Sequence, residues 1–123
     1  MNSTEVRKIR GFKCDFCHKD MIAGHELVLN NLTWEELCKK AGSPWAPENT
    51  LLCPECIEKL MGRPIVLEDL LIKWKNGLIG PVPMNTWYMR MNGMLEEAKP
   101  YIIESVKHNR FAREVWKKAG VEV

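Results

Sequence analysis

Two cysteine pairs of identical spacing constrain this chain of 123 residues more than any other feature. Two residues separate Cys14 from Cys17, and two separate Cys53 from Cys56. Each C-x-x-C turn brings two thiolates to one side of a tight loop, so two turns supply a tetrahedral shell of four sulfurs. Thiolates are soft ligands that favour zinc over magnesium or calcium. We therefore predict a Zn2+ site with these four cysteines as its ligands.

Cysteines in this pattern have roles other than zinc binding, and His18 is a further possible ligand. Four cysteines also hold iron–sulfur clusters, but nothing else in the chain indicates electron transfer. A redox C-x-x-C belongs after a strand in a βαβ unit, and the sequence shows no such unit. The fifth cysteine, Cys38, occupies an apolar position of a predicted helix and is interpreted as a buried free thiol. His18 directly follows Cys17, and we expect it beside the site or in solvent.

The expected compartment is the cytoplasm. No apolar run approaches the roughly 18 residues that a membrane span needs. Residues 1–13 are polar and basic, without the apolar stretch of a secretory signal. A reducing compartment disfavours disulfides, which supports the metal interpretation of the cysteines.

The pattern around the two pairs predicts a treble clef, or zinc-ribbon-like, module. Pro54 fits a first helical turn, and Ile57, Leu60 and Met61 continue an apolar helical stripe that ends before Gly62. The first pair is expected to lie in a knuckle loop, followed by a strand or hairpin over residues 21–29 with a turn near Gly24. The metal would replace the core that so small a module lacks.

Further helices are expected between and after the cysteine pairs. Thr33 and Glu36 form a capping-box pattern, which predicts an inserted helix from Trp34 to Lys40 that stops at Gly42. Leucines repeat at helical spacing over residues 67–75. The predicted layout is a zinc module over 1–76, a Gly/Pro linker over 77–84 and a C-terminal helical segment over 85–123. The fold class is thus helix-rich α+β.

The C-terminal segment is predicted to contain two helices. Asn85 or Thr86 caps the first, over residues 87–95, whose aromatic and methionine side chains are interpreted mainly as core. Pro100 starts or kinks the last helix, and Gly120 ends it.

Two clusters of basic side chains are candidate partner-binding or nucleic-acid-binding residues. A basic N-terminal arm precedes the first pair, and a basic face is expected on the last helix; together they contain Arg7, Lys8, Arg10, Lys13, Lys107, Arg110, Arg113, Lys117 and Lys118. The net charge is only +2, so the chain is not a histone-like polycation. Solvated surface charge is the ordinary alternative for both clusters.

Catalysis is not expected. An HNH-type nuclease shares the treble clef, but it needs a histidine base near the second knuckle and further histidine ligands. The chain has three histidines, and its His108-Asn109 pair lies far beyond Cys56. A four-cysteine shell also leaves no open position for a water.

The chain resembles small uncharacterised bacteriophage zinc-ribbon-like proteins over roughly residues 12–72. The matching positions are Cys14, Cys17, Trp34, Leu52, Cys53, Cys56, Glu58, Gly62, Arg63 and Asp69. Ile57 and Met61 stand where the pattern has leucine. The resemblance implies zinc, a phage-like origin and a setting in the host cytoplasm, and it implies no reaction.

Two functional hypotheses follow. The first is a non-catalytic zinc-binding interaction module that docks on a host protein, such as a defence or transcription factor, and inhibits or modulates it. Near-neutral charge and many tryptophan and methionine residues support it. The alternative is a DNA- or RNA-binding zinc protein that uses the basic arm and the basic helix face.

Overall fold

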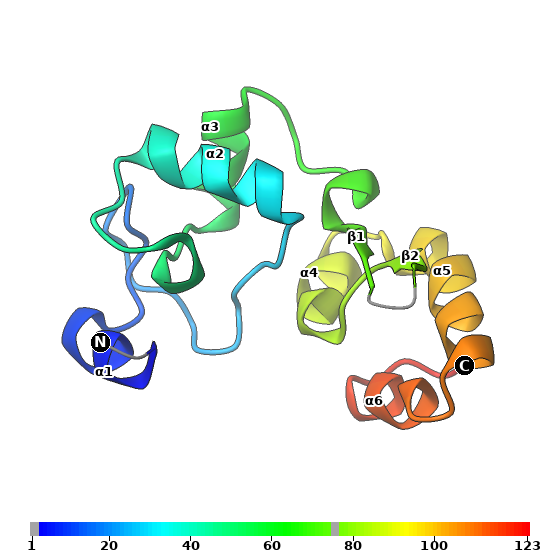
Figure 1. Ribbon diagram of the computed structural model, residues 1–123. Helices are drawn as coiled ribbons and strands as arrows, with labels where there is room; N and C mark the ends of the chain where they lie inside the picture. The colour runs from blue at the N-terminus through cyan, green and yellow to red at the C-terminus, as the bar shows by residue number, and fades with distance from the viewer. Residues whose placement is uncertain (1–2, 75–76) are drawn as a thin grey trace. The chain divides into compact units, whose positions relative to one another are not determined.

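The computed structural model describes residues 3–74 and 77–123, apart from the side chains at positions 3, 4, 7 and 10 (Figure 1). It forms two compact units. The first comprises Met1–Leu27 and Asn31–Ile65, and the second comprises Val28–Asn30 and Val66–Val123. Helices predominate and one small sheet is present, which confirms the helix-rich α+β class.

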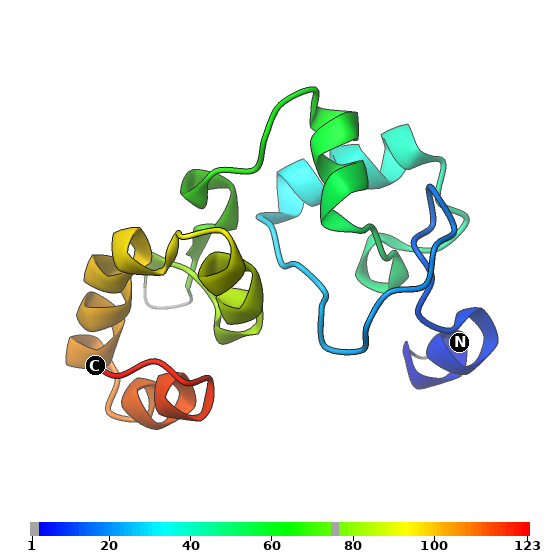
Figure 2. The same ribbon diagram turned by 180° about the vertical axis from the view of Figure 1, so that it is seen from behind.

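The first unit contains α1 (Ser3–Arg10), α2 (Asn31–Ala41), the 3-10 helix η1 (Pro47–Asn49) and α3 (Pro54–Met61). Helices α2 and α3 lie side by side, as both Figure 1 and the reverse view in Figure 2 show. Its core includes Val6, Leu37, Leu52 and Ile57. Most of the predicted basic arm thus forms helix α1, and Val6 on this helix is buried.

Local signals set the ends of α3 as predicted. Pro54 begins the helix, where its missing N–H costs no hydrogen bond. Gly62 follows the last helical residue with φ of 74°, and its N–H donates to Glu58 O at 2.9 Å. This left-handed conformation favours glycine, so the sequence locates the helix end.

Helix α2 begins three residues earlier than predicted. It starts at Asn31, so Thr33 lies within the helix and is not its N-cap. The predicted stop at Gly42 is confirmed, since the helix ends at Ala41. The Trp34 indole N–H donates to Pro47 O at 2.7 Å and ties the helix to η1.

The strand or hairpin predicted over residues 21–29 is absent. This segment is irregular, with a turn in which His25 N–H donates to Ile22 O at 2.9 Å and Gly24 has φ of 88°. Leu27 and Leu29 are buried at alternate positions, as in a strand. However, the backbone of Val28 pairs with a side chain: its N–H donates to Asn85 Oδ1 and its carbonyl accepts from Asn85 Nδ2, both at 2.8 Å.

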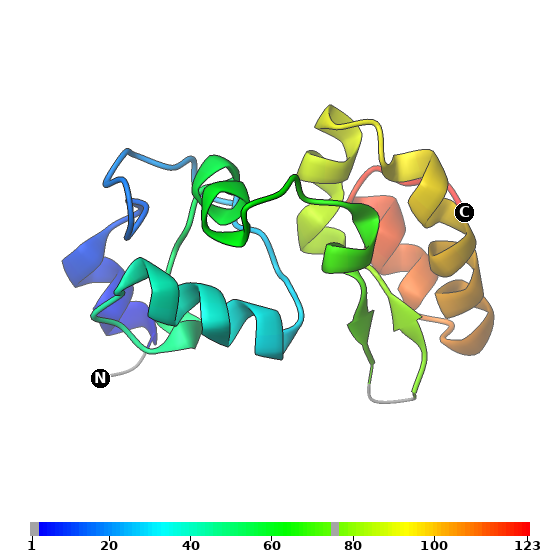
Figure 3. The ribbon, with the colours of Figure 1, turned by 90° about the horizontal axis from the view of Figure 1, so that it is seen from above.

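The second unit begins with the 3-10 helix η2 (Leu67–Leu70) and strands β1 (Ile72–Lys73) and β2 (Ile79–Gly80). The strands are antiparallel, with Ile72 opposite Gly80. The 3-10 helix η3 (Pro83–Asn85) and helices α4 (Thr86–Met91), α5 (Leu95–His108) and α6 (Ala112–Lys118) follow. Figure 3 shows the strand pair, with α5 next to β2.

The helix predicted over residues 67–75 is wrong over its described part, and Lys75 lies outside the described residues. One 3-10 turn buries Leu67 and Leu70. The Asp69 carboxylate accepts the Val66 N–H at 2.9 Å, and the chain then extends into β1. Helical spacing of leucines over a single turn did not distinguish a turn from a helix.

Residues 77–84 are part of the second unit, where we expected a linker. They contribute β2, whose last residue Gly80 is buried together with Pro81. Residues 66–74, assigned to the zinc module from sequence, also belong to this unit. The chain therefore passes between units near residues 65–66, and again around residues 28–30.

The predicted last helix is two helices. Asn109 leaves the helical conformation with ψ of 108°, and its side-chain oxygen accepts the Phe111 N–H at 3.0 Å. Pro100 lies inside α5, and Gly120 follows α6 with φ of 84°. The core interpretation of the preceding segment is confirmed for Tyr88 and Met89, whereas Met91 is 74% exposed. Among the described helices, none has the length and apolar character to cross a membrane.

Replacing Asn85 by Ala should lower the free energy of unfolding by about 2–4 kcal/mol, because two backbone groups of Val28 lose their partner beside a fully buried side chain. Urea unfolding followed by circular dichroism measures the change. The matched control is Asn92→Ala, which removes one hydrogen bond to Tyr88 O from an exposed residue. Equal unfolding midpoints for the two variants would contradict the role given to Asn85.

Candidate metal centre

The four paired cysteines converge on one point in the first unit. Their Sγ atoms all lie within 4.8 Å of one another. Cys14, Cys53 and Cys56 are buried, and Cys17 is exposed. The sequence prediction is thus confirmed as a four-cysteine cluster that could hold a metal ion.

The first cysteine pair lies in a closed loop. An antiparallel bridge between Lys13 and Asp20 joins the two ends of this loop. Inside it, Cys14 N–H donates to Lys19 O at 3.0 Å, and His18 N–H donates to Cys14 O at 2.9 Å. His18 has φ of 65°, a conformation that turns the chain sharply back. Its side chain is exposed, as expected from the sequence.

The second pair is positioned by the start of α3. Cys53 is the N-cap residue, and Cys56 lies in the first turn. The Ile57 N–H donates to Cys53 O at 3.0 Å, which fixes the helical turn between the two sulfurs. The helix therefore supplies both ligands with a rigid spacing.

Backbone and side-chain contacts hold the two knuckles together. Asp15 N–H donates to Leu51 O, and Leu51 N–H donates to the Asp15 carboxylate, both at 2.8 Å. An ion pair between Lys19 and Glu55 at 3.0 Å also joins the first loop to α3. This ion pair is exposed, so it contributes about 1 kcal/mol or less. Sequence reasoning missed Asp15, and its only signal was an acidic residue inside a C-x-x-C turn.

Hydrogen bonds to sulfur favour a thiolate at Cys14. Its Sγ accepts the Cys53 N–H at 3.4 Å and the Phe16 N–H at 3.5 Å. Burial opposes ionisation, but these donors and the Cys17 N–H outweigh it and lower the pKa of Cys14 to about 7. Such N–H groups stabilise the charged form directly.

The other two buried thiols are harder to ionise. Burial raises the pKa of Cys53 to about 11, and burial together with the neighbouring thiols raises the pKa of Cys56. Several negative charges this close repel one another, so the full set of thiolates needs a bound cation. The Sγ atoms of Cys17 and Cys53 are 3.8 Å apart, about the edge of a tetrahedron with metal–sulfur bonds of about 2.3 Å.

Cys38 lies outside the cluster, which confirms its interpretation as a buried free thiol. It belongs to α2 and is 5% exposed. Burial raises the pKa of its thiol despite a contact with the Thr50 hydroxyl.

The basic candidates are divided between the two units. The side chains of Arg7 and Arg10 lie outside the described residues, and Lys8 on α1 is exposed. Lys13 pairs with Asp20 at 3.8 Å, and Lys107 pairs with Glu104 at 3.7 Å. The structure places Arg110, Arg113, Lys117 and Lys118 in or just before α6, all exposed.

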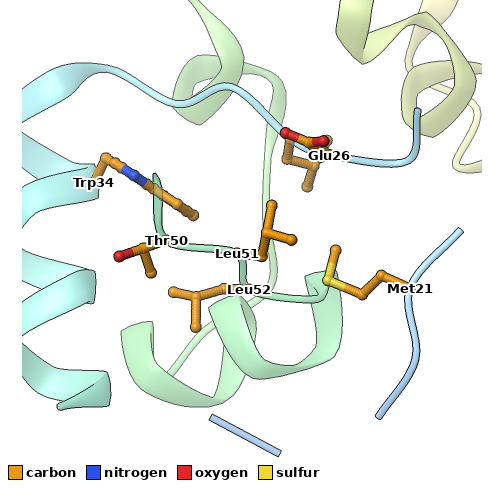
Figure 4. A pocket seen from close by; sticks show the side chains of 7 residues that line it. Met21, Glu26, Trp34, Thr50, Leu51 and Leu52 are labelled. Atoms are coloured by element: carbon orange, nitrogen blue, oxygen red, sulfur yellow. The ribbon is translucent and has the colours of Figure 1, made fainter. Parts of the chain in front are cut away.

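A pocket in the first unit offers no catalytic set. Its lining is mainly apolar, with the Trp34 ring, Leu51 and Met21 facing the space and the Glu26 carboxylate at one side (Figure 4). Thr50 carries the one hydroxyl group among the lining residues, and this hydroxyl is hydrogen-bonded to Ser43 Oγ at 2.8 Å. No nucleophile and base pair is present among these residues.

Comparison with known proteins identifies no relative. No family model matches the chain, and neither the curated proteins nor the solved structures contain a significant match.

Replacing Cys53 by Ser should abolish tight metal binding, because one of four convergent sulfurs is lost. It should also unfold much of the first unit, since metal binding and folding are coupled in such sites. Elemental analysis and thermal melting of the purified protein measure both. Cys38→Ala is the matched control and should keep the metal content unchanged. A Cys53→Ser protein with unaltered metal content and melting would refute the site.

Zinc affinity should rise by at least about 100-fold per pH unit near neutrality, since two or more protons leave per ion bound. The reason is that the raised pKa values of Cys53 and Cys56 keep both thiols protonated in the metal-free chain. Competition with a chromophoric chelator at two pH values, corrected for the chelator's own protons, measures the slope. A tenfold change or less per pH unit would show that these thiols are not ligands.

Proposed function

We propose that this protein is a non-catalytic, zinc-stabilised interaction module that docks on another protein. The observation that carries the proposal is the convergence of four cysteine Sγ atoms within 4.8 Å, three of them on buried residues. A cluster of this kind is a structural metal site, since its ligands are built into the core of a small unit.

Zinc fits this donor set best. Four sulfurs suit tetrahedral zinc, and iron bound by four cysteines is the alternative. The knuckle loop around Cys14 and the helix that carries Cys53 and Cys56 are two parts of a treble clef. We infer a module of this type without a hairpin between them.

The non-catalytic part of the proposal rests on coordination chemistry. Four protein sulfurs complete a tetrahedral shell, so a bound zinc would have no position left for a substrate or a water. His108, in the pair considered for a nuclease, is exposed on α5 and contacts Glu104 at 3.1 Å. It belongs to the second unit, whereas the cysteines belong to the first.

Docking on a protein is supported by large apolar side chains that the first unit leaves in solvent. Ile9, Ile22 and Leu32 are 64%, 67% and 79% exposed. Each lies on a different element of the unit, at α1, the turn after the first knuckle and the start of α2. The resemblance to phage proteins supports a host-cell partner, such as a defence or transcription factor, whose activity the docked module would inhibit or modulate.

Site-specific photo-crosslinking tests this function. A photoreactive phenylalanine analogue replaces Leu32 in one variant and Ile22 in another, and zinc-loaded protein is irradiated in nuclease-treated bacterial lysate. We expect the same host protein to be crosslinked from one or both positions and to disappear when Cys53→Ser is added. The matched control carries the analogue at Glu68, which is exposed in the second unit. Crosslinks that are the same with and without Cys53→Ser would contradict a zinc-dependent docking surface.

A further inference from the structure

We propose that the exposed face of α6 binds single-stranded nucleic acid through Arg110, Phe111, Arg113, Lys117 and Lys118, here called the α6 surface. This activity goes beyond protein docking by the first unit and does not depend on it.

The α6 surface carries unbalanced positive charge. Residues 107–118 contain five basic side chains and one acidic side chain, Glu114. Lys107 is paired with Glu104. The other four cations are exposed, and within the described part of the chain none of them forms an ion pair. A polyanion would therefore meet four exposed cations and one carboxylate, that of Glu114.

The packing of α6 fixes which side faces solvent. Trp116 is 1% exposed and directs one side of the helix into the core, with Ala112 and Ala119 partly buried beside it. Arg113 and Lys117 are four residues apart, so they are neighbours on the helix surface, and both are exposed. The Arg90 guanidinium donates to Gly120 O at 3.1 Å just beyond the helix end and helps to hold this orientation.

An exposed aromatic ring lies just before α6, beside Arg110. Phe111 is 65% exposed, and the Arg110 guanidinium lies 4.9 Å from its ring centroid. Its backbone is fixed, because its N–H donates to Asn109 Oδ1 and its carbonyl accepts the Val115 N–H at 3.2 Å. An exposed ring beside a cation is the combination on which unpaired bases stack while phosphates bind nearby.

The small apolar content of the α6 surface favours nucleic acid over protein. Phe111 and Val115 are the large exposed apolar side chains of this helix, and Val115 is 48% exposed. Stable protein interfaces bury about 1,200–2,000 Å² with an apolar centre, far more than two side chains provide. Nucleic acid binding instead draws its free energy from phosphate neutralisation. Stacking on Phe111 requires a base free of its duplex partner, which selects single strands.

Fluorescence anisotropy of a labelled oligothymidylate of about 15 nucleotides, titrated with zinc-loaded full-length protein, tests the proposal. We expect binding at about 50 mM salt that weakens about 50-fold by about 200 mM, because four phosphate contacts give a logarithmic slope of about −2.8. The absence of binding at the lower salt concentration with about 100 μM protein would overturn the proposal.

Variants separate the aromatic and charged contributions. Phe111→Ala should weaken binding at least about 5-fold, and Phe111→Trp should retain it. The double variant Arg113→Ala/Lys117→Ala should reduce the size of the salt slope by about 1.4. The matched control is Lys39→Ala/Lys40→Ala, which removes two exposed lysines from the last turn of α2. An equal effect of the control, or no effect of Phe111→Ala, would overturn the α6 surface as the site.

Competition with poly-L-glutamate distinguishes an acidic protein partner from nucleic acid. We expect poly-L-glutamate to compete poorly and oligouridylate to compete well, because only the latter has bases. If poly-L-glutamate binds as tightly as the oligonucleotide and does not depend on Phe111, the surface fits an acidic protein and the proposal fails. The zinc content of each variant is measured in parallel, so this failure is distinct from a loss of the metal site.

Discussion

Mutual repulsion among crowded thiolates is the constraint on which the first unit depends. Cys14, Cys53 and Cys56 take up buried positions that apolar side chains fill elsewhere in this core. Without a cation, burial raises the pKa of Cys53 to about 11 and also raises that of Cys56, so these two positions contribute neutral thiols with little packing advantage. A divalent ion turns the same positions into four strong bonds. The unit thus gains from the metal what its short helices, two of them eight residues long, do not supply by packing.

The two knuckles differ in how the chain makes them rigid. The second is set by a helix start, where proline and the following turn fix the sulfur spacing within α3. The first depends on a bridge between Lys13 and Asp20 and on the contacts of Asp15 with Leu51. Asp15 therefore couples the exposed loop to the buried segment that leads into Cys53. The exposed cysteine of the cluster, Cys17, belongs to this first loop.

Features that depend on neighbours in sequence were predictable, and features that depend on distant partners were not. The ligands and the ends of α3 follow from spacing, proline and glycine. The predicted strand near Leu27 and Leu29 failed because Val28 pairs with Asn85, 57 residues away, and alternation alone does not reveal a side-chain partner. The prediction of a helix from Leu67 was wrong because two leucines one turn apart also fit a 3-10 turn before β1. At the metal site, Cys38 was separated correctly from the ligands, but Asp15 carried no periodic signal.

Asn85 receives its backbone partner from Val28–Asn30, a stretch of three residues that lies between two parts of the first unit in sequence but belongs to the second. A gene fragment that encoded only Val66–Val123 would lack the backbone groups of Val28 to which the Asn85 amide bonds. Neither unit is therefore encoded by one continuous stretch of sequence. Recombination at residues 65–66 would place Asn85 and its partner Val28 in different proteins, and both hydrogen bonds between them would be lost.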